Sequence, residues 1–205
     1  MIQHSFPTRR SSDLLFVGNS RRSRRAIVDD LSPVIHDLAV YGKGWTSDLI
    51  DPLHVRGELI PNEQLHRYYA SARIVLNDHW PDMRAQGFLS NRLYDALASG
   101  AFVISDAVVG IEQEFDDAVV TYTEPDELRR LADQYLADGA ARRAKAERGR
   151  RAVLGRHTFA HRVDRMLEVV AEVEPLRPHG IERWRDFAAW LARFERRRSG
   201  PFRAG

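Results

Sequence analysis

Short apolar runs alternate with amphipathic stretches along most of this chain. Most of the apolar runs end at Gly, Asn or another turn residue, which is typical of buried strands in a parallel sheet. Strands are predicted at residues 14–17, 37–41, 55–59, 74–76, 102–104 and 119–122. Between them, apolar residues recur at helical spacing in residues 26–31, 61–72 and 91–99. This alternation predicts an α/β fold with a parallel sheet and helices on both of its faces.

A short helix is predicted between two strands in the middle of the chain, at residues 91–99. Asn91 is expected to be its N-cap, because a side-chain oxygen there can accept an N–H of the first turn. Gly100 is expected just after the last turn, where the backbone becomes left-handed. The polar stretch 79–90 before this helix is predicted to be a loop.

Beyond residue 125 the pattern becomes helical throughout. Helices are predicted at 126–138 and 140–154, and a third is expected to begin at a Thr158 cap. Residues 175–205 are predicted to be a linker followed by an amphipathic helix with a basic tail. The apolar stripe of that last helix consists of Trp184, Phe187, Leu191 and Phe194. Such a stripe needs a partner surface.

The first residues, 1–14, read MIQHSFPTRRSSDL and show neither helical nor strand periodicity. Back-translation of His4 to Leu14 gives a string that resembles the end of a common short-read sequencing adapter. We therefore expect a non-native, adapter-derived leader over 1–14, joined to a coding fragment that begins near Leu15. A flexible basic leader is the alternative interpretation. The adapter interpretation implies that an earlier part of the natural protein, with any targeting signal, is missing.

Composition excludes several function classes. The chain has 205 residues of which 43% are hydrophobic, enough for a core, and this excludes global disorder. The net charge of +2 is too small to indicate a nucleic-acid partner. The absence of Cys excludes disulfides, thiolate zinc sites and Cys nucleophiles. No apolar run reaches the ~18 residues of a transmembrane segment, and no signal-peptide pattern follows Met1, so a cytoplasmic protein is predicted.

Topology alone predicts where a ligand would bind. Right-handed crossovers bring all carboxyl ends of parallel strands to one edge, where ligands of such sheets bind. The residues at that edge are predicted to be 18–22, 42–45, 77–80, 87–92 and 106–112. The turn from Gly18 to Arg22 is predicted to open a helix, so its amides and guanidinium groups suit a phosphate. It lacks Walker A and GxGxxG spacing, and an ordinary tight turn with solvated arginines is the alternative.

Three other residues near that edge allow more than one interpretation. Asp95 lies one helical turn after Asn91, and its carboxylate could accept hydrogen bonds from two vicinal hydroxyls, as on a ribose. A solvent-facing helix residue is the alternative. Trp45 either stacks on a nucleobase or packs beneath a loop. His79 lies in the stretch DHWPD, which lacks metal-ligand spacing, so no metal site is predicted and His79 is interpreted as part of a strand-end loop.

The order of these motifs resembles the C-terminal, donor-binding domain of GT-B glycosyltransferases. More narrowly, it resembles the bacterial spore-maturation CgeB-like group of the glycosyltransferase group 1 superfamily. SNRLYDALASG, from Ser90 to Gly100, is similar to that group's Ser-x-Arg-x-x-Glu-x-x-x-x-Gly pattern, with Asp95 in place of Glu. The resemblance covers about 15–173. It identifies 15–174 as a Rossmann-like, nucleotide-sugar-binding domain, one half of a GT-B fold.

The resemblance implies an enzyme of hexosyltransferase type that moves a sugar from a nucleotide-sugar to an unknown acceptor. The transfer would need no metal and no cofactor besides the donor substrate. The resemblance implies that the diphosphate is lined by Gly18 and Asn19 and that Arg92 lies near the phosphates. Asp95 would bind the ribose hydroxyls. The full set of expected donor-binding residues is Gly18, Asn19, Arg21, Asn91, Arg92 and Asp95.

Two features of the family pattern are missing from this sequence. The first Glu of the superfamily's Glu-x7-Glu pattern would fall at Gly87, so a contact that many relatives make to the donor sugar has no counterpart here. GT-B sites lie between two domains, and the N-terminal one is an expected partner outside this sequence. We therefore assign no catalytic base and expect the fragment to be inactive alone. A non-catalytic interaction module with a degenerate nucleotide site is the alternative, and the lack of GxGxxG disfavours an NAD-dependent enzyme.

Overall fold

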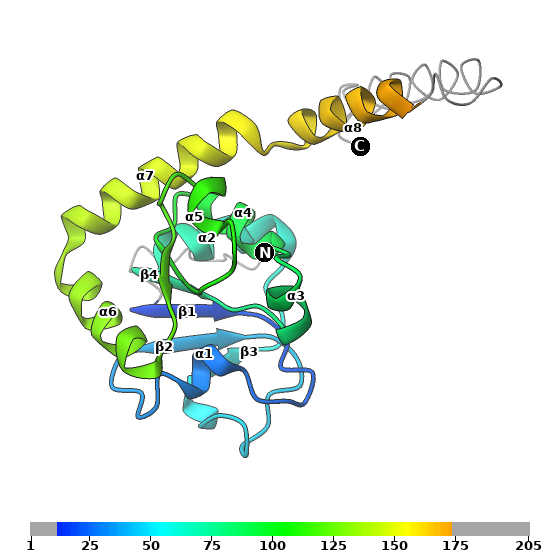
Figure 1. Cartoon of the computed structure of the whole chain (residues 1–205). Helices are drawn as coiled ribbons and strands as arrows, with labels where there is room; N and C mark the ends of the chain where they lie inside the picture. Colours follow the sequence, from blue (N-terminus) through cyan, green and yellow to red (C-terminus); the bar gives the residue numbers. More distant parts are fainter. Residues whose placement is uncertain (1–11, 174–205) are drawn as a thin grey trace, which may run out of the picture. The chain divides into compact units, whose positions relative to one another are not determined.

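The computed structural model describes residues 12–173, and Figure 1 shows how their helices and strands are arranged. A first compact unit ends at His157, and a second begins at Thr158. The predicted linker and last helix, 175–205, lie outside the described residues, as do residues 1–11 of the predicted leader.

The first unit contains one parallel sheet. Its strands are β1 (Leu14–Val17), β2 (Leu38–Tyr41), β3 (Val55–Gly57), β4 (Ile74–Asn77), β5 (Val103–Asp106) and β6 (Val120–Tyr122). They lie side by side in the order β3-β2-β1-β4-β5-β6, and each neighbouring pair is parallel. This confirms the predicted α/β, Rossmann-like fold. The order reverses between β1 and β4, and the crevice at such a switch point is where ligands bind in this class of sheet.

Helices follow most of the strands, close to the predicted positions. They are α1 (Ala26–Asp29), α2 (Asn62–Ser71), α3 (Pro81–Ala85), α4 (Asn91–Ala98), α5 (Ile111–Glu114), α6 (Pro125–Ala137), α7 (Gly139–Arg156) and α8 (Phe159–Val173), with a 3-10 turn η1 (Pro52–His54). The sequence pattern predicted neither α3 nor α5. The prediction of a loop over 79–90 was therefore wrong at α3.

Two apolar clusters cover the two faces of the sheet. Successive residues of a strand point to opposite faces, so Leu14 and Phe16 join one cluster while Leu15 joins the other. Residues of α1 and α6 complete the first cluster, and residues of α2, α4 and α7 complete the second. The side chains of Leu14, Leu15 and Phe16 have no exposed surface. Burial on both faces holds the carboxyl ends of the strands in fixed relative positions.

The sheet begins inside the predicted leader. Leu14 is fully buried and pairs with Leu38 of β2 and Ile74 of β4. The Asp13 carboxylate forms an ion pair with Arg73 at 2.8 Å, and the Asp13 carbonyl accepts the Ile74 N–H at 3.0 Å. Asp13 and Leu14 therefore belong to the fold. The domain bounds 15–174 and 175–205 stay a prediction.

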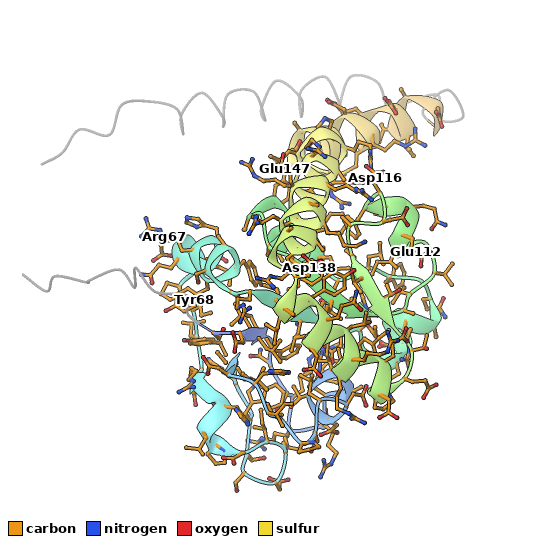
Figure 2. All side chains as sticks on the ribbon, turned by 90° about the vertical axis from the view of Figure 1, so that its left-hand side faces the viewer. Arg67, Tyr68, Glu112, Asp116, Asp138 and Glu147 are labelled. Carbon is orange, nitrogen blue, oxygen red and sulfur yellow. The ribbon has the colours of Figure 1, made fainter. Side chains whose placement is uncertain are left out.

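Helix α7 is fixed by polar contacts at both ends. The Asp138 carboxylate caps its first turn by accepting the Ala140 and Ala141 N–H groups at 3.0 and 2.9 Å. At the other end, Arg156 pairs with Asp116 at 2.9 Å. Figure 2 labels Asp138 and Asp116 beside this helix. Along its length α7 packs on α4, the helix that reaches the switch point.

Helix α8 belongs to the second unit, and Thr158 caps it as predicted. The Thr158 Oγ1 atom accepts the His161 N–H at 3.4 Å. Phe159 and Met166 of α8 are 89% and 67% exposed. Among the described residues, no helix combines the length and the apolar character that crossing a membrane requires.

A glycine pair on α7 tests the packing between α4 and α7. A Cβ atom added at Gly149 would lie 2.5 Å from Leu97 Cδ2, a fully buried side chain, whereas one added at Gly155 would meet nothing within 4 Å. We expect Gly149→Ala to lower the free energy of unfolding by roughly 1–2 kcal/mol, because overpacking outweighs the gain in helix propensity. Gly155→Ala should raise it by up to ~1 kcal/mol. Urea unfolding measures both, and equal effects of the two variants would contradict the close packing.

Candidate functional site

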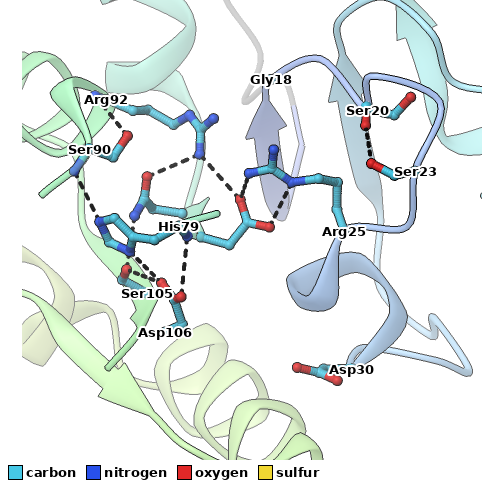
Figure 3. Close-up of polar contacts among 12 residues, drawn as sticks. Gly18, Ser20, Ser23, Arg25, Asp30, His79, Ser90, Arg92, Ser105 and Asp106 are labelled. Carbon is cyan, nitrogen blue, oxygen red and sulfur yellow. Dashed lines mark hydrogen bonds and ion pairs between the residues drawn. The ribbon is translucent and has the colours of Figure 1, made fainter. Parts of the chain in front are cut away.

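Buried polar side chains gather where β4 and β5 end. Asn77, Asp78 and His79 end or follow β4, and Ser105 and Asp106 end β5. All five residues are at most 7% exposed. Buried polar groups are almost always hydrogen-bonded, so each of these side chains requires a partner at this edge. Figure 3 shows the contacts that result.

Arg25, the N-cap residue of α1, forms a buried two-pronged ion pair with Asp78. The guanidinium Nε donates to Asp78 Oδ2 at 2.8 Å, and Nη2 donates to Asp78 Oδ1. The two side chains are only 4% and 3% exposed. The Trp80 ring lies 4.0 Å from the Arg25 guanidinium carbon, a cation–π contact. This pair ties the start of α1 to the end of β4.

Arg92 reaches the same carboxylate from the start of α4. Its Nη1 donates to Asn77 Oδ1 at 3.0 Å and lies 3.7 Å from Asp78 Oδ1. Burial lowers the pKa of the Arg92 guanidinium, and the neighbouring Asp78 charge opposes that shift. The N-cap of α4 is Ser90, whose Oγ accepts the Arg92 N–H at 3.3 Å. The prediction that Asn91 caps this helix was wrong by one residue.

Glycines allow the turns after β1 and β2 to approach one another and Arg92. A Cβ atom added at Gly18 would lie 2.6 Å from Arg92 Nη2. One added at Gly42 would lie 2.1 Å from the Gly18 carbonyl oxygen. Trp45 Nε1 donates to that same carbonyl at 3.0 Å, and its ring packs edge-on against Phe16. Of the two interpretations of Trp45, these contacts favour packing against a loop.

The turn after β1 is built differently from the expectation. Arg21 and Arg22 have positive φ angles of 54° and 59°, and α1 begins only at Ala26. The Gly18–Arg22 turn therefore does not open a helix. The Arg21 guanidinium carbon lies 4.8 Å from the Trp80 ring, so Arg21 does lie at the switch point. Asn19 is exposed, and its Oδ1 accepts the Lys43 N–H at 2.7 Å, which joins the two turns.

Asn91 and Asp95 lie one turn apart on α4 and are both exposed. Surrounding protein raises the pKa of the Asp95 carboxyl by desolvation. The Asp95 carbonyl accepts the Ser99 hydroxyl at 2.7 Å, whereas its carboxylate makes no hydrogen bond or ion pair within residues 12–173. Burial raises the pKa of Tyr69 to about 12, and the charges of Arg92 and Asp95 both act on its hydroxyl. Asp95 therefore lies beside the same buried tyrosine as Arg92.

The structure thus brings together some of the sequence-predicted residues more closely than others. Gly18 contacts Arg92, while Arg21 joins them through Trp80 and Arg25. Asn19 lies in the same turn but bonds toward β2, and Asn91 makes no hydrogen bond within the described chain through its side chain. All six residues belong to the two segments that border the switch point.

Sequence reasoning assigned His79 to a strand-end loop but did not predict its buried hydrogen bonds. Its side chain has no exposed surface, and its Nδ1 lies 2.6 Å from Asp106 Oδ1. The Ser90 N–H donates to His79 Nε2 at 3.0 Å. Because Nε2 accepts that hydrogen bond, the ring proton is on Nδ1, pointing at the carboxylate. The signal available in the sequence was that β4 and β5 are neighbours, which places the residues after them side by side.

A sequence model of the glycosyl transferase-like family matches residues 21–168. The chain belongs to this family. No curated protein matches it by sequence.

Solved structures of glycosyltransferases share the fold of this glycosyl transferase-like domain. Sucrose-phosphate synthase from Thermosynechococcus elongatus is similar with a TM-score of 0.61 and 18% identity, over 81% of this chain and 46% of that one. T4 phage BGT, solved with its UDP-glucose substrate, is similar with a TM-score of 0.59 and 15% identity, over 75% of this chain and 47% of that one. WaaG, a glycosyltransferase involved in lipopolysaccharide biosynthesis, is similar with a TM-score of 0.52 and 18% identity, over 76% of this chain and 49% of that one. The domain thus has the GT-B-type fold and spans about half the length of these structures.

Within residues 12–173 of the glycosyl transferase-like domain, no three His, Asp or Glu side chains gather in an arrangement that could hold a metal ion. His79, which sits in the DHWPD stretch, instead uses both ring nitrogens for hydrogen bonds with protein groups. The cations at the switch point are the guanidinium groups of Arg21, Arg25 and Arg92. These are the groups of the described chain that can oppose a negative charge there.

Loss of the Asp78 charge should destabilise the domain strongly. Asp78→Asn would leave Arg25 buried without a counter-charge, which typically costs about 3–5 kcal/mol. The matched control is Asp37→Asn, whose partner Arg56 and own side chain are each 50% exposed. Surface pairs contribute about 0–1 kcal/mol, so the control should change little. Urea unfolding compares the two, and a similar small loss in both would contradict the structural role of Asp78.

Proposed function

We propose that this domain binds the nucleotide-sugar donor of a glycosyl transfer at the β1–β4 switch point, as the donor-binding half of a GT-B enzyme of the CgeB-like group. The observation that carries the proposal is the Arg92 guanidinium. Its Nη1 is bonded to Asn77, whereas its Nη2 faces Gly18 and makes no hydrogen bond within residues 12–173. A donor at that position lacks an acceptor, and a phosphate oxygen would supply one.

The charges at the site favour an anion there. The Arg25 Nε and Nη2 groups both donate to the Asp78 carboxylate and neutralise its charge. Arg92 therefore lies beside a carboxylate that is already paired. Arg21 adds an exposed cation held against Trp80. The diphosphate would lie beside the contact between the Gly18 turn and Arg92, with Arg21 over it. Gly18 has no side chain to obstruct this approach.

Asp95 would hold the ribose one helical turn farther along α4. Its carboxylate is unengaged within the described chain, and neighbouring atoms already desolvate it, as its raised pKa indicates. A desolvated acceptor that lacks a partner gains more from a hydroxyl donor than a fully hydrated one does. A pair of vicinal hydroxyls would fit its two oxygens.

The chemistry that these groups support is stabilisation of a leaving diphosphate. In the transfer, an acceptor oxygen attacks the anomeric carbon while the bond from that carbon to the diphosphate oxygen breaks. Negative charge then builds on the diphosphate, and preorganised guanidinium groups in a partly desolvated site stabilise such charge. In this proposal Arg92 and Arg21 supply the counter-charge without a metal ion. The proton of the acceptor goes to a base that we do not assign to this chain.

Titration calorimetry with UDP, GDP and ADP tests the site. At least one should bind, and Asp95→Asn should weaken that ligand roughly 10- to 100-fold, because hydrogen bonds to a charged acceptor are worth ~1.5–3 kcal/mol. The matched control, Asp164→Asn on α8, should leave affinity unchanged. Failure of all three nucleotides to bind the folded chain would favour the interaction-module alternative.

The same variant should not be less stable at neutral pH. The pKa of Asp95 is raised in the folded state, so folding favours the protonated form and the ionised carboxylate opposes stability above that pKa. Asp95→Asn removes this ionised group, and the free energy of unfolding at neutral pH should stay equal or rise slightly. A clear loss of stability would show that Asp95 has a structural role instead.

A second variant tests the proposed contact with phosphate. Arg21→Gln should weaken nucleotide binding about fivefold, equivalent to ~1 kcal/mol for one exposed charge-assisted contact. Arg24→Gln is the control, since Arg24 is an equally exposed arginine that pairs with Asp29 at 3.2 Å instead. The difference between the two variants should shrink at high salt. Equal affinities of the two variants at low salt would exclude Arg21 from the site.

A further inference from the structure

His79 connects the ends of two strands to the start of α4. Its Nδ1 lies 2.6 Å from Asp106 Oδ1 at the end of β5, and its own N–H donates to Asp106 Oδ2 at 3.2 Å. Its Nε2 accepts the Ser90 N–H at the N-cap of α4. Both ring nitrogens are occupied and the side chain is fully buried, so the ring cannot reach a substrate. Its role is therefore to position other groups.

The hydrogen bonds that begin at His79 return to it through the donor site. Ser90 Oγ accepts the Arg92 N–H, and Arg92 Nη1 donates to Asn77 Oδ1. Asn77 Nδ2 then donates to Ser105 Oγ at 2.9 Å, and that hydroxyl donates to Asp106 Oδ1 at 3.1 Å. Figure 3 shows this closed ring. A change at the His79–Ser90 bond therefore acts on Arg92 through one intervening residue.

We propose that His79 is a positioning residue for donor binding, whose Nε2 acceptor holds Ser90 and, through it, Arg92 in place. This inference rests on the proposed function, since Arg92 is the phosphate ligand there. The Asp106 carboxylate fixes the Nδ1–H group, which leaves Nε2 as the acceptor for the Ser90 N–H. Loss of that acceptor frees the start of α4.

The charged groups around the imidazole come from every neighbouring element of the site. They are Asp106 at the end of β5, Asp78 after β4, Arg25 at the start of α1 and Arg92 on α4, and Asp78 holds both guanidinium groups. The two carboxylates and two guanidinium groups balance, so a neutral imidazole leaves the buried site without net charge.

The bond between His79 and Ser90 is tested from the His79 side. His79→Leu removes both the Nε2 acceptor and the Nδ1 donor, whereas His79→Gln keeps an acceptor and a donor. The pair therefore separates loss of the hydrogen bonds from loss of the ring. UDP-glucose is the probe, with GDP- and ADP-glucose run in parallel.

Affinity for the nucleotide-sugar is measured by calorimetry on the full chain at about pH 7.5. His79→Leu should weaken binding roughly fivefold or more, because Ser90 and Arg92 are then no longer held in place. His79→Gln should recover most of that loss. The control His36→Gln removes a surface histidine paired with Asp133 at 2.8 Å, and it should bind like the wild type.

Nitrogen-15 NMR of the imidazole rings gives a test that needs no ligand. We expect His79 to show the Nδ1–H form at pH 7.5 in the full chain, and an Nε2–H form would overturn the positioning role. Nucleotide-sugar binding by His79→Leu that equals binding by the wild type, or that equals binding by His79→Gln, would overturn it while leaving the proposed function intact. If no nucleotide-sugar binds the folded chain, the proposed function fails, and the NMR result still decides the state of His79.

Discussion

The Asp78 carboxylate lies between two guanidinium groups, and the architecture of the binding edge depends on this arrangement. An unpaired buried charge is costly, so Arg25 and Arg92 can both be buried here only because Asp78 lies within reach of each. Arg25 fixes the start of α1, and Arg92 belongs to the first turn of α4. One carboxylate at the end of β4 thus sets the position of helices that follow two different strands.

This arrangement separates stability from binding within a single helix. The inner face of α4 contributes Leu93 and Leu97 to the core and packs on α7. Its outer face carries Asn91 and Asp95, which are exposed and make no contribution to the core. Arg92 lies between the two faces and takes part in both, since one guanidinium nitrogen bonds the protein and the other does not. Substitutions on the outer face should therefore alter ligand affinity with little effect on folding.

The sequence supported a correct sheet and a correct edge, because both follow from apolar periodicity and the handedness of crossovers. It placed Gly18 and Arg92 at the same edge, and the structure brings them into contact. It did not predict that Arg25 would be buried, because that burial depends on Asp78 far along the chain. The buried hydrogen bonds of His79 were not predicted for the same reason. Buried polar partners are specified by tertiary contacts, which leave no periodic signal in one sequence.

The two strands at the margins of the sheet, β3 and β6, contain three residues each, one fewer than every strand between them. An exposed strand margin is a template for pairing with another chain, and a longer one offers more unpaired backbone groups. Another copy that added a strand at either margin would gain few backbone hydrogen bonds. Short edge strands therefore limit edge-to-edge aggregation during folding, since a parallel sheet assembles slowly.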